Sequence, residues 1–220
     1  MLYSSDRKKT LGGWLKKHHE KEFSSPIKFQ KFLFFYETLS ILEKDKYELN
    51  KLRGWKQGPV FSDVWGDYNY RKEEFVKDAK KTYSNNKKKI NNDRAKLSSF
   101  LVSTMTTSEL SDLTHEFNIW KAKENEINSN DNKKNILLHI KDFNKHDTEM
   151  LLTLKKVYPI NYINSVEIRE ESGKIFILKK SDIEKLNENS EYAFLALSKE
   201  NSLKNPAYVS VSDEGVLLVD

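Results

Sequence analysis

The sequence predicts an α+β protein that has a mainly α-helical N-terminal domain and a small α+β C-terminal extension. Apolar residues recur at helical spacing through the first part of the chain, whereas short alternating apolar runs separated by turn residues follow later. A chain of 220 residues is long enough for one domain with an appendage. We therefore expect a helical domain at residues 1–126 and a small α+β unit at residues 132–220.

Composition narrows the class of protein. Hydrophobic residues make up 37% of the chain and charged residues 32%, which is typical of a soluble globular protein. No stretch approaches the roughly 18 consecutive apolar residues of a membrane-spanning helix, and the N-terminal segment lacks the apolar core of a secretory signal. We therefore expect a cytoplasmic protein with no membrane partner. The absence of cysteine excludes disulfides, thiolate catalysis and thiolate-bound zinc.

The charge is distributed unevenly along the chain. Residues 1–100 contain 23 Lys and Arg against 13 Asp and Glu, whereas residues 101–220 contain 15 against 20. The densest basic run, residues 71–96, is typical either of a solvated helix and loop or of a segment that follows a phosphate backbone. The solvated interpretation is favoured, because only Phe75 and Tyr83 offer rings on which bases would stack.

The segment "SSPIKFQKFLFFYETLSILEK" predicts the central helix of the helical domain. Its serines are N-cap candidates, and Pro26 lies near the first helical position, where its missing N–H costs nothing. Apolar residues fall on nearly all sides of this helix, which indicates burial by several neighbours. Upstream, a helix within residues 4–23 is expected to be weakened by Gly12 and Gly13.

Two further helices are marked by their N-terminal residues. Asp93 is the expected cap of a helix in the segment 91–105, and Thr106 with Glu109 has the spacing of a capping box. Asn and charged residues then dominate a stretch with little to bury. We expect the domain boundary in this linker, at residues 124–134.

The last third of the chain mixes helix and strand signals. A short helix is expected at residues 148–158, and alternating apolar runs around Ser172-Gly173 predict a β-hairpin. Ser181 and Glu184 repeat the capping-box spacing. The remaining predictions are a strand at residues 191–198 and a pair of strands within residues 207–220 that are joined by a turn at residues 213–215.

The segment "GWKQGPVFSDVW" contains Gly54, Lys56 and Gly58 and therefore raises the question of a phosphate-binding loop. Its spacing matches neither the dinucleotide fingerprint nor the Walker loop, and no strand is expected before it. We interpret it as a turn at Gly58 and a helix that begins at Pro59.

The histidines do not predict an active site. His18 and His19 are adjacent and lie about 100° apart on a helix, so they do not face one metal ion from the same side. His115 is expected in the last turn of its helix, as a partly cationic group near the C-terminal dipole. A hydrolase that uses His115 would need a nucleophile and an orienting group, and only Thr114 and Glu116 are close in sequence. We expect no catalytic residue, no metal and no cofactor.

Three segments, taken in order, resemble the Panacea domain found in SocA-like antitoxins and in phage-associated proteins of GepA type. "IKFQKFLFFYETLSI" (residues 27–41) is similar to the opening "LQKLLYF" helix of that family, and "GWKQGPVFSDVWGDY" (residues 54–68) is similar to its "AWKYGPVVPEVY" segment. "LSDLTHEFNIW" (residues 110–120) resembles "LS-x-LTH" followed by Pro-Trp, with Ile119 where proline is usual. The resemblance covers about residues 20–126.

The resemblance implies a mainly helical domain that binds protein and is not an enzyme. Such domains neutralise a toxin encoded beside them, and SocA-like members also hand the toxin to a cytoplasmic protease. Leu33 and nine further residues match the family motifs, and those nine, which are partner-binding candidates, are Gln30, Lys31, Trp55, Gly58, Pro59, Val60, Thr114, His115 and Trp120.

Several questions about the partner stay open at this point. The basic run at residues 71–96 and the tail from about residue 132 depart from the family pattern, so the tail is a candidate for choosing the partner. The acidic balance of residues 101–220 would suit a toxin with a basic face. A binder of this kind needs exposed aromatic anchors, and the four candidates, each of which would more often lie in a core, are Trp14, Trp55, Trp65 and Trp120. The alternative function is a nucleic-acid-binding prophage regulator that uses the basic N-terminal half.

Overall fold

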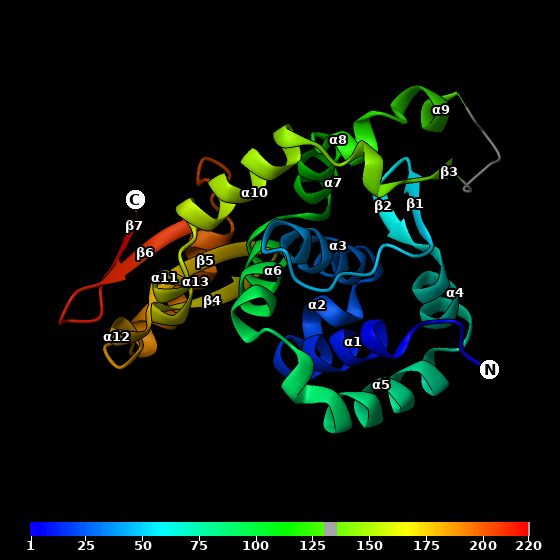
Figure 1. Cartoon of the computed structure of the whole chain (residues 1–220). Helices are drawn as coiled ribbons and strands as arrows, with labels where there is room; N and C mark the ends of the chain where they lie inside the picture. The colour runs from blue at the N-terminus through cyan, green and yellow to red at the C-terminus, as the bar shows by residue number, and fades with distance from the viewer. Residues whose placement is uncertain (130–135, 220) are drawn as a thin grey trace. The chain divides into compact units, whose positions relative to one another are not determined.

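The computed structural model describes residues 1–129 and 136–219, and the chain divides into two compact units. Unit 1 comprises Met1–Val157 and unit 2 comprises Tyr158–Asp220. Helices predominate and two small sheets accompany them, which confirms the predicted α+β class with mainly helical content (Figure 1). In the part of the chain that is described, no helix combines the length and the apolar character needed to cross a membrane.

Unit 1 contains ten α-helices, two short 3₁₀ turns and three strands among its described residues. The helices are α1 (Asp6–His18), α2 (Glu20–Ser24), α3 (Pro26–Leu42), α4 (Ser62–Tyr70), α5 (Lys72–Asn86), α6 (Asn92–Thr104), α7 (Thr107–His115), α8 (Asn118–Lys121), α9 (Glu124–Asn128) and α10 (Lys145–Val157). The 3₁₀ turns are η1 (Lys87–Lys89) and η2 (Ile140–Asp142), and the strands are β1 (Leu52–Trp55), β2 (Gly58–Phe61) and β3 (Ile136–Leu137).

α3 is the central helix of unit 1, as predicted. Ser25 caps it by accepting a hydrogen bond from the backbone N–H of Lys28, and Pro26 is its first residue. Every residue from Phe29 to Ser40 is buried, because α1, α2, α4, α6, α7, α10 and β2 all pack against this helix (Figure 1). The all-round apolar pattern therefore reflects coverage on every face.

The two glycines of α1 allow it to approach α5 closely. A Cβ atom at Gly13 would overlap the backbone carbonyl of Ala79 and lie 2.6 Å from Cβ of Tyr83. The sequence predicted only that Gly12 and Gly13 weaken this helix. The structure adds the reason for them, because a larger residue at position 13 does not fit against α5.

Gly13→Ala is expected to lower the free energy of unfolding by about 2 kcal/mol, because the added methyl group must push α5 away. Gly66→Ala is the matched control, since Gly66 also lies in a helix but the nearest atom to its added Cβ is Arg71 Nη2, at 3.9 Å. Alanine there is expected to raise the free energy of unfolding by about 0.5–1 kcal/mol. Urea unfolding measures both, and an unchanged stability of Gly13→Ala would contradict the close packing of α1 on α5.

The N-terminal caps of α6 and α7 are partly as expected. The side chain of Asn91 caps α6 by accepting from the backbone N–H of Arg94, so the prediction of Asp93 was wrong by two residues. Asn91 has the extended backbone that a cap requires, whereas Asp93 already lies in the first turn. The capping box of Thr106 and Glu109 is confirmed, with both reciprocal hydrogen bonds present.

A β-hairpin occupies the place of the helix start expected at Pro59. β1 and β2 pair antiparallel with Trp55 opposite Gly58, so Lys56 and Gln57 form the turn. The prediction was wrong because proline is also tolerated in an edge strand, and β2 is at the edge of the sheet order β2-β1-β3. A strand therefore does precede Gly58, and α4 begins only after β2 ends.

Unit 1 continues past the linker expected at residues 124–134. α9 lies within that stretch, whose residues 130–134 are outside the described part of the chain. Beyond it, β3 pairs antiparallel with β1, with Ile136 opposite Gly54, and α10 packs against α3 and α8. The division between the two units accordingly falls after Val157 and not near residue 130.

A buried carboxylate ties α10 to α8. Asp147 accepts hydrogen bonds from the backbone N–H groups of Asn118 and Ile119, which begin α8. These N–H groups have no partner within their own helix, so the carboxylate acts as a cap supplied from a distant segment.

Unit 2 is a four-stranded sheet with three helices among its described residues. Its elements are α11 (Ile160–Ser165), β4 (Val166–Glu171), β5 (Lys174–Lys179), α12 (Lys180–Ile183), α13 (Glu188–Ser198), β6 (Ala207–Val211) and β7 (Leu217–Val219). The strand order is β4-β5-β6-β7, and the β5–β6 pair is parallel while the other two pairs are antiparallel. The side chain of Phe194 from α13 packs into the core with Phe176 and Leu178 of β5.

The hairpin β4–β5 and the pair β6–β7 are confirmed, and so is the short helix now called α10. Ser172 and Gly173 form the β4–β5 turn with φ angles of +50° and +84°. The strand predicted at residues 191–198 was wrong, because α13 occupies it and begins with reciprocal hydrogen bonds between Asn187 and Ser190. The capping box expected from Ser181 does not form, since α12 starts one residue earlier, at Lys180, without a side-chain cap.

Candidate interaction site

The three segments that resemble the Panacea domain meet at one place in unit 1. α3 contacts β2, α7 contacts β2, and α3 contacts α7. We call the nine partner-binding candidates the motif cluster, and its members are Gln30, Lys31, Trp55, Gly58, Pro59, Val60, Thr114, His115 and Trp120. Helical and strand residues far apart in sequence are thus brought to a common site around the hairpin.

Gln30 fastens the hairpin to α3. Its side-chain oxygen accepts from the backbone N–H of Phe61 at 2.8 Å, and its side-chain nitrogen donates to the backbone oxygen of Phe61 at 3.4 Å. Gln30, Pro59 and Val60 are all buried. These three residues act inside the fold and present little surface to a partner.

Lys31 is a buried lysine beneath the hairpin turn. Its side chain is 1% exposed, and Nζ donates a hydrogen bond of 2.5 Å to the backbone oxygen of Gln57. Among the described residues, no carboxylate lies within ion-pair distance of Nζ. Burial without a counter-ion lowers the pKa of Lys31 to about 7, because the charged form loses its hydration. Such a group is unusual outside functional sites.

Gly58 makes room for this lysine. Its φ angle is +95°, and an added Cβ would overlap Lys31 Nζ and lie 2.5 Å from Thr114 Oγ1. Glycine is therefore needed for the backbone conformation and for the space between α3 and α7.

His115 and Trp120 stack beside the hairpin. Their ring centroids are 3.9 Å apart at an interplanar angle of 21°, and Trp120 Nε1 donates to the backbone oxygen of Trp55 at 3.0 Å. Burial, and next the charge of Lys31, lower the pKa of His115. This direction opposes the expected partly cationic ring, although His115 does end α7. Its Nε2 is buried and has no hydrogen-bond partner among the described residues.

The geometry around His115 does not form a nucleophile, a base and an orienting group. The hydroxyl of Thr114 donates to the backbone oxygens of Leu110 and Ser111, not to the imidazole. Within residues 1–129 and 136–219, no three or more His, Cys, Asp or Glu side chains are grouped so that they could hold a metal ion.

The exposed part of the site is the hairpin turn and the tryptophans beside it. Trp55 and Trp65 are partly exposed and lie edge to face, with ring centroids 5.0 Å apart. We call Trp55, Lys56, Gln57 and Trp65 the hairpin surface. The other two tryptophans proposed as anchors are core residues, since Trp14 is 3% and Trp120 is 2% exposed. Sequence reasoning did not single out the backbone oxygen of Gln57, because only the folded hairpin brings it to Lys31.

The fold and the site define an α+β protein in which hydrogen bonds from Gln30 and from the buried Lys31 hold a β-hairpin against α3. Comparisons of the chain with models of protein families, with curated proteins and with solved structures give no match. The resemblance to the Panacea domain therefore stays a prediction that depends on the three motifs.

Proposed function

We propose that this protein is an antitoxin-like binding protein, which acts in the cytoplasm and neutralises a cognate protein toxin without catalysis. The observation that supports the proposal is the convergence of all three motifs on one hairpin. The motif cluster would be the support of the binding surface, and the hairpin surface would be its contact area.

The hairpin surface has the properties of a protein-binding site. Trp55 and Trp65 offer adjacent, partly exposed aromatic rings, and tryptophan is among the residues that contribute most to binding energy. The hairpin is held by Gln30 from one side and by Lys31 and Trp120 from beneath. A surface fixed in this way loses little conformational entropy on binding, which favours affinity.

Trp65→Ala is expected to weaken toxin binding about 30-fold, which corresponds to the loss of about 2 kcal/mol typical of a central aromatic anchor. Tyr70→Ala is the matched control, because Tyr70 lies on the same helix, α4, and is 81% exposed. The toxin would be the product of the neighbouring gene, and co-expression should relieve its growth arrest. Calorimetry of the purified pair measures both variants.

Two outcomes would count against this assignment. Equal affinities of Trp65→Ala and Tyr70→Ala would remove the hairpin surface as the contact area. A neighbouring gene product that is harmless when expressed alone, or one that is toxic and whose arrest this protein does not relieve, would remove the antitoxin function itself.

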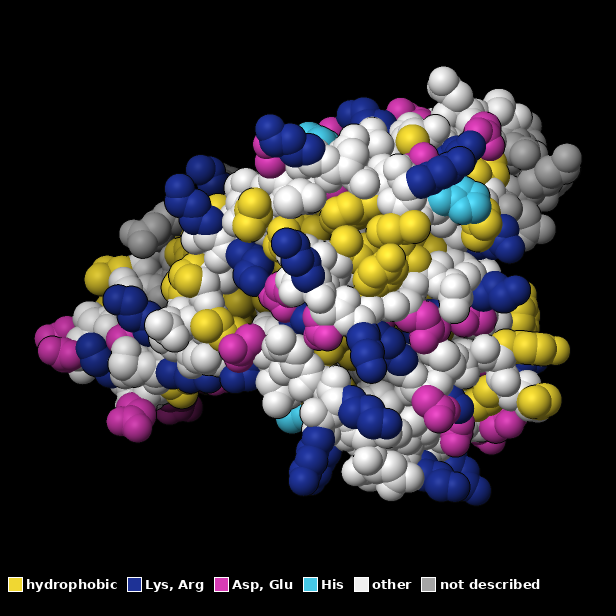
Figure 2. Space-filling model, viewed as in Figure 1, with side chains coloured by type: hydrophobic (Ala, Val, Ile, Leu, Met, Phe, Trp, Pro, Cys, Tyr) yellow, Lys and Arg dark blue, Asp and Glu magenta, His cyan; other side chains and the backbone are white. Residues whose placement is uncertain are grey.

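The alternative is a nucleic-acid-binding regulator, and the placement of the basic run favours it. Lys80, Lys81 and Lys87 are exposed at the C-terminal end of α5 and on η1, and Tyr83 lies in contact with His18 of α1. On the face drawn in Figure 2, however, Lys and Arg side chains over α1 and α5 are interspersed with Asp and Glu. Duplex binding that falls steeply with added salt would support the regulator, and no binding at low salt would exclude it.

We also propose that the acidic balance expected of the C-terminal half acts through unit 2. Residues 158–220 contain 11 Asp and Glu against 7 Lys and Arg. If the toxin has a basic face, this unit would contribute complementary charge and speed the encounter. If a chain that lacks residues 158–220 still neutralises the toxin fully, this part of the proposal is wrong.

A further inference from the structure

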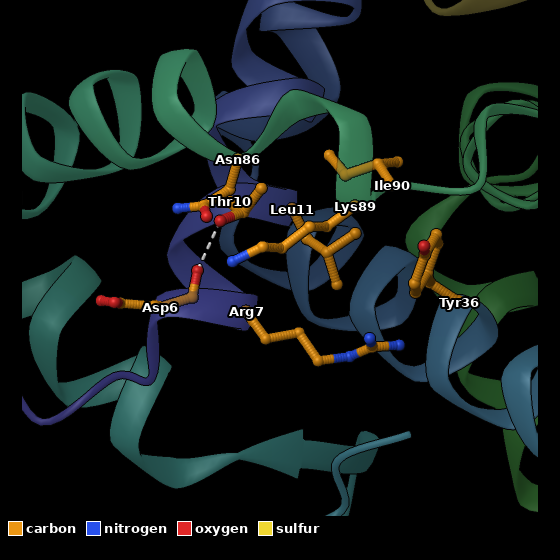
Figure 3. A pocket seen from close by; sticks show the side chains of 8 residues that line it. All are labelled: Asp6, Arg7, Thr10, Leu11, Tyr36, Asn86, Lys89 and Ile90. Atoms are coloured by element: carbon orange, nitrogen blue, oxygen red, sulfur yellow. Dashed lines mark hydrogen bonds between the residues drawn. The ribbon is translucent and has the colours of Figure 1, made fainter. Parts of the chain in front are cut away.

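We infer that a pocket in unit 1, lined by residues outside the motif cluster, binds a small organic anion with an apolar body. The pocket has a volume of about 190 Å³ and lies between α1, α3, the end of α5 and η1 (Figure 3). None of its lining residues belongs to the motif cluster, so the inference is independent of the proposed function.

The charges that line the pocket leave one cation without a partner. Arg7 is occupied by Glu37, with two hydrogen bonds of 2.7 and 3.1 Å, whereas Asp6 lies 2.9 Å from Lys9, which also pairs with Asp78 at 2.7 Å. Lys89 also lines the pocket and, among the described residues, has no carboxylate within ion-pair distance. The charged side chains of the lining, Asp6, Arg7 and Lys89, therefore sum to one positive charge, which favours an anion.

The rest of the lining supplies an apolar wall and hydrogen-bonding groups. Leu11 and Ile90 are buried side chains, and the guanidinium carbons of Arg7 and Arg94 lie 5.4 and 5.1 Å from the centroid of the Tyr36 ring. Burial raises the pKa of Tyr36, so its hydroxyl keeps the proton. That hydroxyl already accepts from the backbone N–H of Asn91 at 3.0 Å, and its proton remains to be donated.

Asn86 adds an acceptor at the opposite side of the lining. Its side-chain nitrogen donates to the backbone oxygen of Thr82 at 3.1 Å, which leaves its side-chain oxygen for an N–H or O–H group on the body of the ligand and not for the anionic group. Figure 3 shows the eight side chains arranged around the pocket, with Lys89 extending from η1 toward α1. A cavity of roughly 150 Å³ accommodates benzene. The occupant is therefore a carboxylate or phosphate joined to about one ring.

The test uses benzoate, phenyl phosphate and, as a neutral analogue, benzyl alcohol, each titrated into the full-length protein. Changes in the amide NMR shifts of Asn86, Lys89 and Ile90 should report saturable binding of at least one anion. The affinity for benzyl alcohol should be lower than that for the anion by a factor of about ten or more. A preference between benzoate and phenyl phosphate distinguishes a carboxylate ligand from a phosphate ligand.

Lys89→Gln should weaken anion binding about tenfold and leave benzyl alcohol binding unchanged. Lys87→Gln is the matched control, because Lys87 belongs to the same 3₁₀ turn, is exposed and does not line the pocket. Thermal unfolding of both variants shows whether the fold is kept. The inference is overturned if neither anion shifts the pocket amides at about 10 mM, or if Lys87→Gln and Lys89→Gln weaken binding equally, since that would indicate nonspecific attraction to a basic surface.

Discussion

A chain that ends at residue 131 is expected to lose cooperative unfolding, whereas a chain that ends at Val157 is expected to keep the fold of unit 1. The shorter fragment matches the domain boundary expected from sequence. It lacks β3, the cap that Asp147 supplies to α8, and the buried side chains of Leu138 and Leu151.

The expected loss is comparable with the whole stability of a small domain. Burial of a leucine side chain contributes about 2 kcal/mol, and a buried N–H left without a partner costs about 1–3 kcal/mol. Leu138 and Leu151 are 2% and 0% exposed, and Asp147 serves the N–H groups of two residues. Together these terms come to roughly 6–10 kcal/mol, and native domains are stable by about 5–15 kcal/mol.

Circular dichroism during urea unfolding separates the two fragments. The matched comparison is between residues 1–131 and residues 1–157, with the full chain as reference. A cooperative transition in the shorter fragment would show that β3 and α10 are dispensable for folding.

If the fragment of residues 1–157 folds, it also tests the proposed role of unit 2. Its proposed neutralisation of the toxin can then be measured with unit 1 intact and unit 2 absent.

The second large effect concerns the dependence of stability on pH. The pKa of Lys31 is about 7 in the folded protein, whereas the ordinary pKa of a lysine side chain, which applies to the unfolded chain, is 10.5. Between these values the unfolded chain holds a proton that the folded chain has released, so a rise in pH favours folding. From pH 7 to pH 9.5 the free energy of unfolding is expected to rise by roughly 3 kcal/mol, at about 1.4 kcal/mol per pH unit.

Lys31→Met should remove this rise and should make the protein more stable at pH 7, because the cost of burying the amine disappears. Lys81→Met is the control, since Lys81 is exposed on α5 and its loss should leave the pH dependence as it is. Urea midpoints at several pH values measure all three proteins. The lowered pKa of His115 affects only the range below its ordinary value of 6.5. If the free energy of unfolding of the unsubstituted protein does not change between pH 7 and pH 9.5, the Lys31 amine is hydrated and its pKa is not lowered.

The same substitution separates stability from function. If Lys31 serves only the fold, Lys31→Met should perform at least as well as the unsubstituted chain in an assay of the proposed toxin neutralisation. If it holds the hairpin surface in its binding conformation through Gln57, the variant should be more stable and bind less tightly.

Most helices of unit 1 were predictable because their local signals agree with their packing. Ser25 and Pro26 mark the start of α3, and Thr106 with Glu109 marks the start of α7. These are interactions within one turn of the chain, so neighbouring residues suffice to identify them.

The errors occur where distant contacts decide between two local alternatives. Pro59 is acceptable both at a helix start and in an edge strand, and only its pairing opposite Gly54 selects the strand. The segment 191–198 is a short apolar run between Glu191 and Ser198, a pattern that suits a buried strand as well as a buried helix. Alanine and leucine favour the helix, and packing of Phe194 against Phe176 is compatible with it.

The candidate site shows the same limit. Spacing alone gave no reason to place Lys31 beside Gly58 or Thr114, and only the family resemblance grouped them before the fold was known. The hydrogen bonds that give the group its chemistry involve backbone atoms of Gln57 and Trp55, which no side-chain pattern reveals.

The two separate reasons for glycine at position 58 carry a consequence for divergence among relatives. Loss of lysine at position 31 would empty the space beside Gly58, but it would not change the backbone angle of +95° that strains any other residue there. In a set of homologous chains we therefore expect glycine at this position to persist after lysine at position 31 has been replaced. The reverse order, lysine retained without glycine, should be rare.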